Sequence, residues 1–253
     1  MKSGAAALQN TLAIENKVGI VLLARYNSRR LPGKALKKIA GKPVLSYIIE
    51  RLKTVVPTQQ IILATSSNKS DDVLANYAKD IGIACFRGSL EKVALRFYEA
   101  AQQLNCTYAC RINGDNIFLD PAVLATMVQE AQQGQYHFLS NVKARTFPKG
   151  MSVEIVAMAY YQKHLTTILN SAYYTEHVMV YLYELAAADA HFYLENKELP
   201  EAAGLQLALD TPEDFERSQW ILQNLKVPHT QADLRKIAAL NEKYQKYIKS
   251  HNS

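Results

Sequence analysis

A buried strand that runs directly into a cationic loop constrains the fold of this chain more than any other feature. Residues 18–24 read VGIVLLA, an apolar run whose length and branching are typical of a strand buried on both faces of a sheet. The following residues, 25–36, read RYNSRRLPGKAL and contain three arginines and one lysine. Open α/β sheets bind ligands outside the carboxyl ends of their strands, and the forked arginine side chain suits phosphate. This stretch therefore predicts a site for a phosphate chain, in preference to a solvated basic loop.

Strands and helices alternate along the first half of the chain. Further strands are expected at 60–65, 83–86 and 106–112, and helices at 44–52, 71–80 and 90–104. This alternation predicts an α/β fold whose mostly parallel sheet is covered by helices on both faces. A helix is expected from residue 121, and the pattern beyond residue 134 is less regular. It indicates strands at 136–142, 151–158, 191–194 and 205–209, and helices at 160–188, 211–225 and from 234 onward.

Two acidic residues are expected at the ends of strands. Asp115 follows the strand at 106–112, and Asp210 follows the one at 205–209. Each has a structural alternative, because Asp is common in turns and before helices. In a parallel sheet both carboxylates would face the basic loop, and two carboxylates with phosphate oxygens are ligands that Mg²⁺ takes. Together they predict a site for phosphate and Mg²⁺.

Composition excludes several classes of protein. The net charge of +6 is spread over 253 residues, which does not predict a nucleic-acid-binding protein. The three cysteines have no CxxC spacing, so we expect buried thiols in a reducing cytoplasm, with neither disulfides nor zinc. No apolar stretch is long enough for a transmembrane helix, so no membrane partner is expected. P-loop and dinucleotide-binding glycine motifs do not occur.

Several ordered motifs carry a resemblance to a known family. ARYNSRRLPGKAL at 24–36 resembles the first nucleotide-binding loop of the cytidylyltransferases that activate acidic sugars. These include the 3-deoxy-manno-octulosonate cytidylyltransferases and the spore-coat polysaccharide biosynthesis protein F family. Asn113-Gly114-Asp115 is similar to the family's Gly-Asp element, and LDTPEDFE at 209–216 to its late acidic element. LEKVALRFYEAA, FPKGMSVEI and EHVMVYLYE are similar to segments typical of the spore-coat branch.

The resemblance implies a three-layer α/β/α nucleotide-diphospho-sugar transferase-like fold and transfer of CMP from CTP to a small acidic acceptor. Lys34 and Arg25 are the implied catalytic residues, and Asp115 and Asp210 the implied Mg²⁺ ligands. The acceptor is expected to meet residues from the second half of the chain, namely Glu154, Glu176 and His177. The nucleotide is expected to contact the loop and the neighbouring strand ends, at Leu23, Ala24, Arg25, Ser28, Arg30, Lys34, Thr65, Asn113 and Asp115.

The domain expectations follow the same pattern. Residues 1–16 are expected to be a disordered tail, 17–230 the catalytic domain, and 231–253 a helical tail. Within the domain, residues 136–204 are expected to serve the acceptor and dimerisation. Tyrosines at helical spacing support a core or homodimer surface there, at Tyr160, Tyr161, Tyr173, Tyr174, Tyr181 and Tyr183.

The chain departs from the spore-coat pattern at four places. Lys92 and Ser152 stand where that branch has Asp, Thr175 where it has Arg, and Asn116-Ile117 where it has Cys-Pro. Two alternatives stay open, the first because such enzymes also use an α/β nucleotide-binding sheet and acids, the second because of these departures. A metal-dependent glycosyltransferase would consume a nucleotide sugar and release no pyrophosphate. A non-catalytic nucleotide-binding protein on the same fold would bind CTP without turnover.

Overall fold

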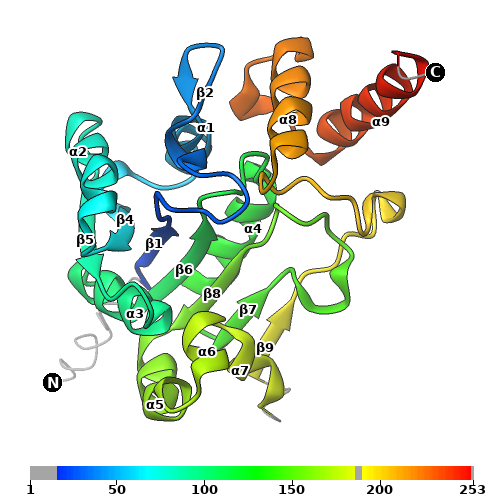
Figure 1. Cartoon of the computed structure of the whole chain (residues 1–253). Helices are drawn as coiled ribbons and strands as arrows, with labels where there is room; N and C mark the ends of the chain where they lie inside the picture. The colour runs from blue at the N-terminus through cyan, green and yellow to red at the C-terminus, as the bar shows by residue number, and fades with distance from the viewer. Residues whose placement is uncertain (1–15, 186–189, 252–253) are drawn as a thin grey trace, which may run out of the picture.

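The computed structural model describes residues 16–185 and 190–251, which form an α/β fold around one seven-stranded sheet (Figure 1). The strands occur in the order β5-β4-β1-β6-β8-β7-β9, and β8 runs antiparallel to both of its neighbours. The other described pairings in this sheet are parallel. The strands are β1 (Val18–Leu23), β4 (Ile61–Ser66), β5 (Ala84–Gly88), β6 (Tyr108–Asn113), β7 (Phe138–Ser140), β8 (Glu154–Ala157) and β9 (His191–Tyr193).

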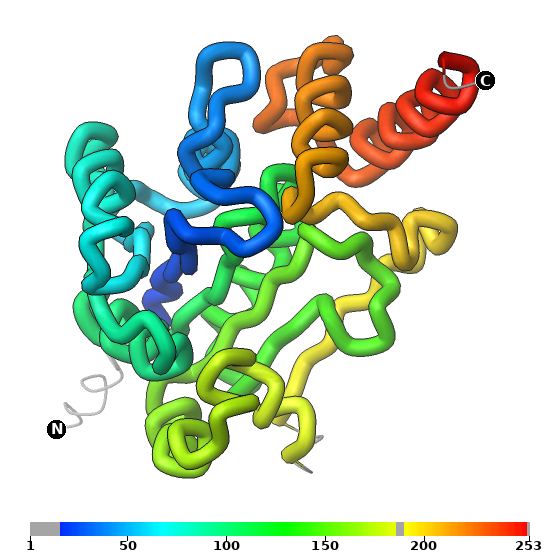
Figure 2. Tube along the Cα trace, viewed as in Figure 1, coloured from blue at the N-terminus to red at the C-terminus, as the bar shows by residue number. Residues whose placement is uncertain are grey.

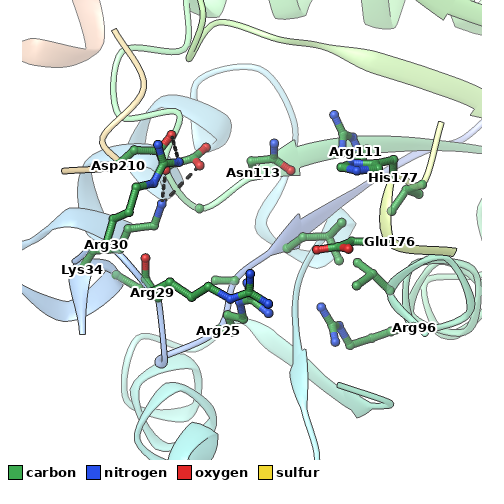
Figure 3. Close-up of a pocket in the computed structure, with 18 residues that line it drawn as sticks. Arg25, Arg29, Arg30, Lys34, Arg96, Arg111, Asn113, Glu176, His177 and Asp210 are labelled. Carbon is green, nitrogen blue, oxygen red and sulfur yellow. Dashed lines mark hydrogen bonds and ion pairs between the residues drawn. The ribbon is translucent and has the colours of Figure 1, made fainter. Parts of the chain in front are cut away.

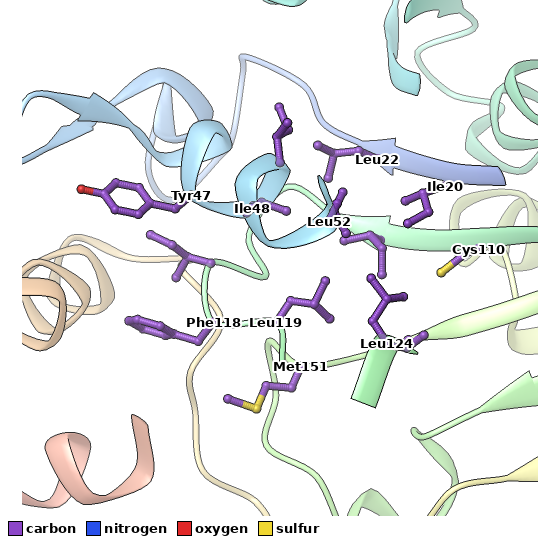
Figure 4. Packing of buried hydrophobic residues seen from close by; sticks show 14 of the residues in the cluster. Ile20, Leu22, Tyr47, Ile48, Leu52, Cys110, Phe118, Leu119, Leu124 and Met151 are labelled. Carbon is purple, nitrogen blue, oxygen red and sulfur yellow. The ribbon is translucent and has the colours of Figure 1, made fainter. Parts of the chain in front are cut away.

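Helices cover both faces of the sheet, as the alternation predicts. Side chains of β1 alternate between the two faces, so Leu22 packs with one set of helices and Val21 with the other. On the Leu22 face the core includes side chains from α1 (Val44–Lys53), α2 (Asp72–Asp80) and α4 (Pro121–Gln132), part of which Figure 4 shows. On the Val21 face it includes side chains from α3 (Val93–Gln103) and α5 (Met158–Leu169). This arrangement confirms the predicted three-layer α/β/α fold.

The remaining elements follow the sheet or extend it. A short hairpin of β2 (Lys38–Ile39) and β3 (Lys42–Pro43) precedes α1, and α6 (Ala172–Glu176) and α7 (Val180–Glu184) follow α5. The chain ends in α8 (Pro212–Asn224) and α9 (Leu234–His251). α8 begins where the sequence predicts, with a Thr211–Asp214 capping box and Pro212 at its first position.

Three expectations about the elements need correction or lie outside the described residues. The helix expected at 90–104 begins only at Val93, after Lys92 as its N-cap residue. The helix expected at 160–188 is three helices, α5, α6 and α7, and its last part, 186–188, lies outside the described residues. The tail expected at 1–16 lies almost wholly outside them as well.

The prediction of a strand at 205–209 is wrong, although the alternating apolar residues of this segment are buried. The segment makes one isolated bridge, between Lys149 and Gln206, and its other backbone bonds join loops. Leu207 N donates to Lys149 O at 2.9 Å, and Leu209 N donates to Asp115 O at 3.0 Å. Leu207 and Leu209 are fully buried in the core, so burial, not sheet pairing, produces the apolar pattern. Figure 2 shows the trace bringing this segment beside the loop that follows β1.

Candidate active site

The loop after β1 is held in place by its own backbone and by a buried carboxylate. Tyr26 O accepts hydrogen bonds from Ser28 N at 3.0 Å and Gly33 N at 2.9 Å, and Gly33 has a φ of 70° that suits glycine. Tyr26 N donates to Asp71 Oδ1 at 2.7 Å, while Asp71 Oδ2 accepts from the backbone and hydroxyl of Ser66. Burial raises the pKa of Asp71, but these hydrogen bonds outweigh it and hold the pKa below its usual value. The loop is thereby tied to the end of β4.

A glycine allows the ends of β1 and β6 to approach. Gly114 N donates to Leu23 O at 2.8 Å, and a Cβ on Gly114 would lie 2.9 Å from the Cβ of Ala24. Any larger residue would push the two loops apart. The close approach places Asp115, the next residue, beside the loop that carries Lys34.

Lys34 joins the two acids that the sequence places at this edge. Its Nζ lies 3.3 Å from Asp115 Oδ2, 2.9 Å from Asp210 Oδ1 and 3.0 Å from Leu209 O. Arg30 reaches the other oxygen of Asp210 at 3.0 Å (Figure 3). Burial raises the pKa of Asp115 above its usual value, an effect that the charge of Lys34 opposes. Among the described residues no group of three or more His, Cys, Asp or Glu side chains is placed to hold a metal, so a cation here would have two protein carboxylates.

A cavity of about 540 Å³ opens over this cluster. Three arginines in its lining, Arg25, Arg29 and Arg96, form no ion pair with a carboxylate in the described parts of the chain. The lining brings together most of the predicted site, namely Leu23, Ala24, Arg25, Ser28, Arg30, Lys34, Asn113, Asp115, Glu176, His177 and Asp210. Thr65 is not among these residues, because its side chain is fully buried in β4.

A second cavity of about 440 Å³ adjoins the first and shares Arg111, Asn113 and His177 with it. Figure 3 shows Asn113 between the Lys34 cluster and Arg111. Glu154 lies in the second cavity only, where it forms an ion pair with Arg111 and accepts a hydrogen bond from Tyr183 Oη at 2.6 Å. Glu154 is only 3% exposed, so its carboxylate is not a solvated charge at the edge of the sheet.

The arginines at 29, 96 and 111 line the first cavity but were not predicted as site residues. Arg96 projects from α3, and burial lowers its pKa to about 10. Arg111 lies inside a strand otherwise rich in buried residues, and a charged residue in such a strand is the signal that could have indicated it.

Of the departures from the spore-coat pattern, Ser152 lines the second cavity and its carbonyl accepts from Asn116 Nδ2 at 3.1 Å. Thr175 is buried and donates to Ile168 O, away from both cavities.

Fold and site together define an α/β protein with a cationic cavity at the carboxyl edge of its sheet, the edge at which such sheets bind ligands. The chain belongs to the cytidylyltransferase family, whose model matches residues 18–246. This finding confirms the resemblance that the motifs carry, and it identifies the chain as a cytidylyltransferase in place of a glycosyltransferase. The described residues contain no helix with the length and apolar character needed to cross a membrane.

Individual relatives agree with this assignment. The chain is 29% identical over 214 residues to the spore coat polysaccharide biosynthesis protein SpsF of Bacillus subtilis, covering 82% of this chain and 87% of the relative. A 3-deoxy-manno-octulosonate cytidylyltransferase of Anaeromyxobacter dehalogenans is 28% identical over 120 residues, 46% of this chain and 48% of its own length. The solved structure of a cytidylyltransferase from Leptospira borgpetersenii is 29% identical, with a TM-score of 0.82, and the match covers 91% of this chain and 95% of that one.

Proposed function

We propose that this cytidylyltransferase transfers CMP from CTP to an acidic sugar for the synthesis of a surface polysaccharide or glycoconjugate. A hydroxyl oxygen of the acceptor bonds to the α-phosphorus of CTP, the bond to the β-phosphate oxygen breaks, and pyrophosphate and the hydroxyl proton leave. The observation that carries the proposal is the Lys34 cluster, which lies in one cavity with three arginines that form no ion pair with a carboxylate of the described residues. Cations that are not neutralised by a carboxylate of the protein are suited to the charge of a triphosphate.

The role of each residue in the proposed reaction follows from its place in the two cavities. Arg25, Arg30 and Lys34 bind phosphate oxygens, and Ser28 adds a hydrogen bond. Lys34 and Arg25 stabilise the negative charge that develops on the phosphate oxygens during transfer. Glu176 and His177 border the cavity at which the acceptor arrives, and Glu154 acts there through Arg111. The reaction requires the protein to position the two substrates and to neutralise phosphate charge, and little covalent chemistry is required of the protein itself.

Asp115 and Asp210 fit a magnesium site. Both carboxylates lie within hydrogen-bonding distance of one ammonium group, so a small cation between them would meet one oxygen from each. Mg²⁺ commonly binds one or two carboxylates and completes its shell with phosphate oxygens and water. When bound, it supplies neutralisation of phosphate charge, and it would require Lys34 to turn from the carboxylates toward the phosphates.

Two further parts of the proposal concern assembly and location. A homodimer through α5, α6 and α7 is supported by Tyr173, which is 57% exposed, whereas Tyr161 is fully buried and belongs to the core. A cytoplasmic location is supported by three free cysteines, Cys85, Cys106 and Cys110. Sedimentation of the purified protein tests the dimer.

The experiment that tests the function is pyrophosphate release with Mg²⁺, each of the four nucleoside triphosphates in turn, and a panel of acidic sugars. Release with CTP and one acceptor would support the proposal and identify that acceptor. Tight binding of CTP without turnover for any acceptor would favour the non-catalytic alternative. Absence of CTP binding would contradict the proposal.

A further inference from the structure

The second cavity has a cationic end that the nucleotide does not need. It shares Arg111, Asn113 and His177 with the first cavity, and the part of its lining that the first cavity does not share includes a wall from the segment after β7, with Lys143 and Arg145. A CTP molecule in the first cavity leaves this wall free. An acceptor that meets the nucleotide at the shared residues therefore extends toward these two cations.

Charge in the cavity is not balanced among the residues that the structure describes. Glu154 is the one carboxylate in the described lining, and it is already bound by Arg111 and Tyr183. Within the described residues, Arg145 forms no ion pair, and Lys143 Nζ lies 4.2 Å from the centre of the Tyr193 ring with no carboxylate partner. Two cations at one wall with no acid to pair with them favour an anionic ligand.

The backbone that presents these cations is strained and firmly anchored. Ala144 and Arg145 have φ values of 65° and 53°, a left-handed conformation that residues other than glycine rarely adopt in succession. The segment is fixed at its start by the buried side chain of Asn141, which donates to Met151 O at 2.8 Å and accepts from Val153 N at 2.8 Å. Val142 N also donates to Ser140 Oγ at 2.9 Å. Such strain persists where the surrounding structure holds it, which is characteristic of ligand-binding segments.

From these observations we infer that the acceptor carries a second anionic group, remote from the hydroxyl that attacks CTP, and that Lys143 and Arg145 bind it. The group is an oxyanion, either a phosphate ester or a second carboxylate. This inference rests on the proposed function, because it assigns the substrate class of the same enzyme. Lys143 and Arg145 are binding residues for the acceptor and take no part in binding CTP.

Calorimetric titration of the CTP-saturated protein with inorganic phosphate, and separately with acetate, tests the inference. Saturation with CTP occupies the first cavity, so the arginines there cannot take up the added anion. Three proteins are compared, namely the unaltered chain, the double variant Lys143→Gln/Arg145→Gln, and Lys149→Gln. Lys149 is an exposed lysine of the same segment that does not line the cavity, so its variant is the control for loss of a nearby positive charge outside the cavity.

We expect the unaltered chain to bind at least one of the two anions, and the Lys149→Gln variant to bind that anion with the same Kd. The Kd of the double variant for the same anion should be about tenfold higher or more. The anion that binds more tightly distinguishes a phosphate ester from a carboxylate. The Kd for CTP should agree within about twofold in all three proteins, which shows that the double variant is folded. No anion binding by the unaltered chain, or equal binding by the double variant, would overturn the inference. Failure of the proposed function would appear separately, either as the absence of heat when CTP itself is added or as CTP binding without pyrophosphate release for any acceptor.

Discussion

Lys34 Nζ lies 2.9 Å from Asp210 Oδ1, although 176 positions separate the two residues in the chain. The same ammonium group lies 3.3 Å from Asp115 Oδ2, so one lysine joins two acids from distant segments. The Lys34 side chain is 14% exposed, which limits the screening of these charges by water. The geometry makes Lys34 the centre of the charge arrangement that a triphosphate would enter.

Replacement of Lys34 by alanine should lower turnover by about a hundredfold or more, because a cation that stabilises transition-state charge would be lost. Steady-state pyrophosphate release with CTP and the acceptor measures this. Lys38→Ala is the matched control, since Lys38 is an exposed lysine of β2 that lines neither cavity. Turnover of Lys34→Ala near that of the control would remove Lys34 from the catalytic residues.

Substitution of either site acid should weaken the response to Mg²⁺. In Asp115→Asn and Asp210→Asn, the Mg²⁺ concentration for half-maximal activity should rise roughly tenfold or more, because one of two carboxylate ligands is lost. Titration of activity with Mg²⁺ measures this, with Asp80→Asn as a control at an exposed position of α2. A chelator should abolish the activity of the unaltered chain. Unchanged Mg²⁺ dependence in both site variants would place the metal elsewhere.

The sequence was sufficient to predict that Lys34, Asp115 and Asp210 lie together, but not to predict every contact that brings them together. The strand-then-loop pattern placed Lys34 and Asp115 at one edge of the sheet, because parallel strands end together. Asp210 reaches the same place although the strand predicted before it does not exist. Its position depends on the hydrogen bond from Leu209 N to Asp115 O, a contact between two loops that has no periodic signature in the sequence.

The ion pair between Arg111 and Glu154 could not be predicted from the sequence for a different reason. The two residues are direct cross-strand partners in the antiparallel pairing of β6 with β8. The chain passes through α4 and β7 before it returns as β8, so strand order was needed to bring the two residues together. The acceptor role that we propose for Glu154 is therefore an indirect one, through Arg111.

Acidification should destabilise the fold through His229. Its ring packs against Tyr47 with 4.9 Å between ring centres, and burial lowers its pKa from 6.5 to about 4, with Glu50 opposing the shift. Below pH 6.5 the unfolded chain takes up a proton that the folded chain does not, so stability falls as the pH drops toward 4. Between pH 7.5 and 4.5 the loss should be about 2–3 kcal/mol.

Urea denaturation at both pH values measures the effect, with His229→Gln as the comparison. The variant should lose less stability on acidification than the unaltered chain, by about the same 2–3 kcal/mol. An identical loss in both proteins would show that other groups cause the acid sensitivity.

Gly150 should be needed to hold the segment that carries Asp210. It has a φ of 91°, and a Cβ there would lie 2.4 Å from Ala208 N and 2.6 Å from the carbonyl carbon of Leu207. Gly204 has a similar φ of 76° but nothing within 4 Å of an added Cβ, so it is a matched control. Gly204→Ala should cost about 1 kcal/mol in backbone strain alone.

Gly150→Ala should cost about 2–4 kcal/mol more than Gly204→Ala, because backbone atoms of 207–208 must move as well. The displaced segment continues into Asp210, so the variant should also require more Mg²⁺ for half-maximal activity, whereas Gly204→Ala should not. Urea denaturation and Mg²⁺ titration of the two variants measure both effects. Equal stability would show that the chain relaxes around the new methyl group. A loss of stability without a change in Mg²⁺ dependence would show that Asp210 is held by the Thr211–Asp214 cap and Lys34 alone, independently of the contact between Gly150 and the 207–208 backbone.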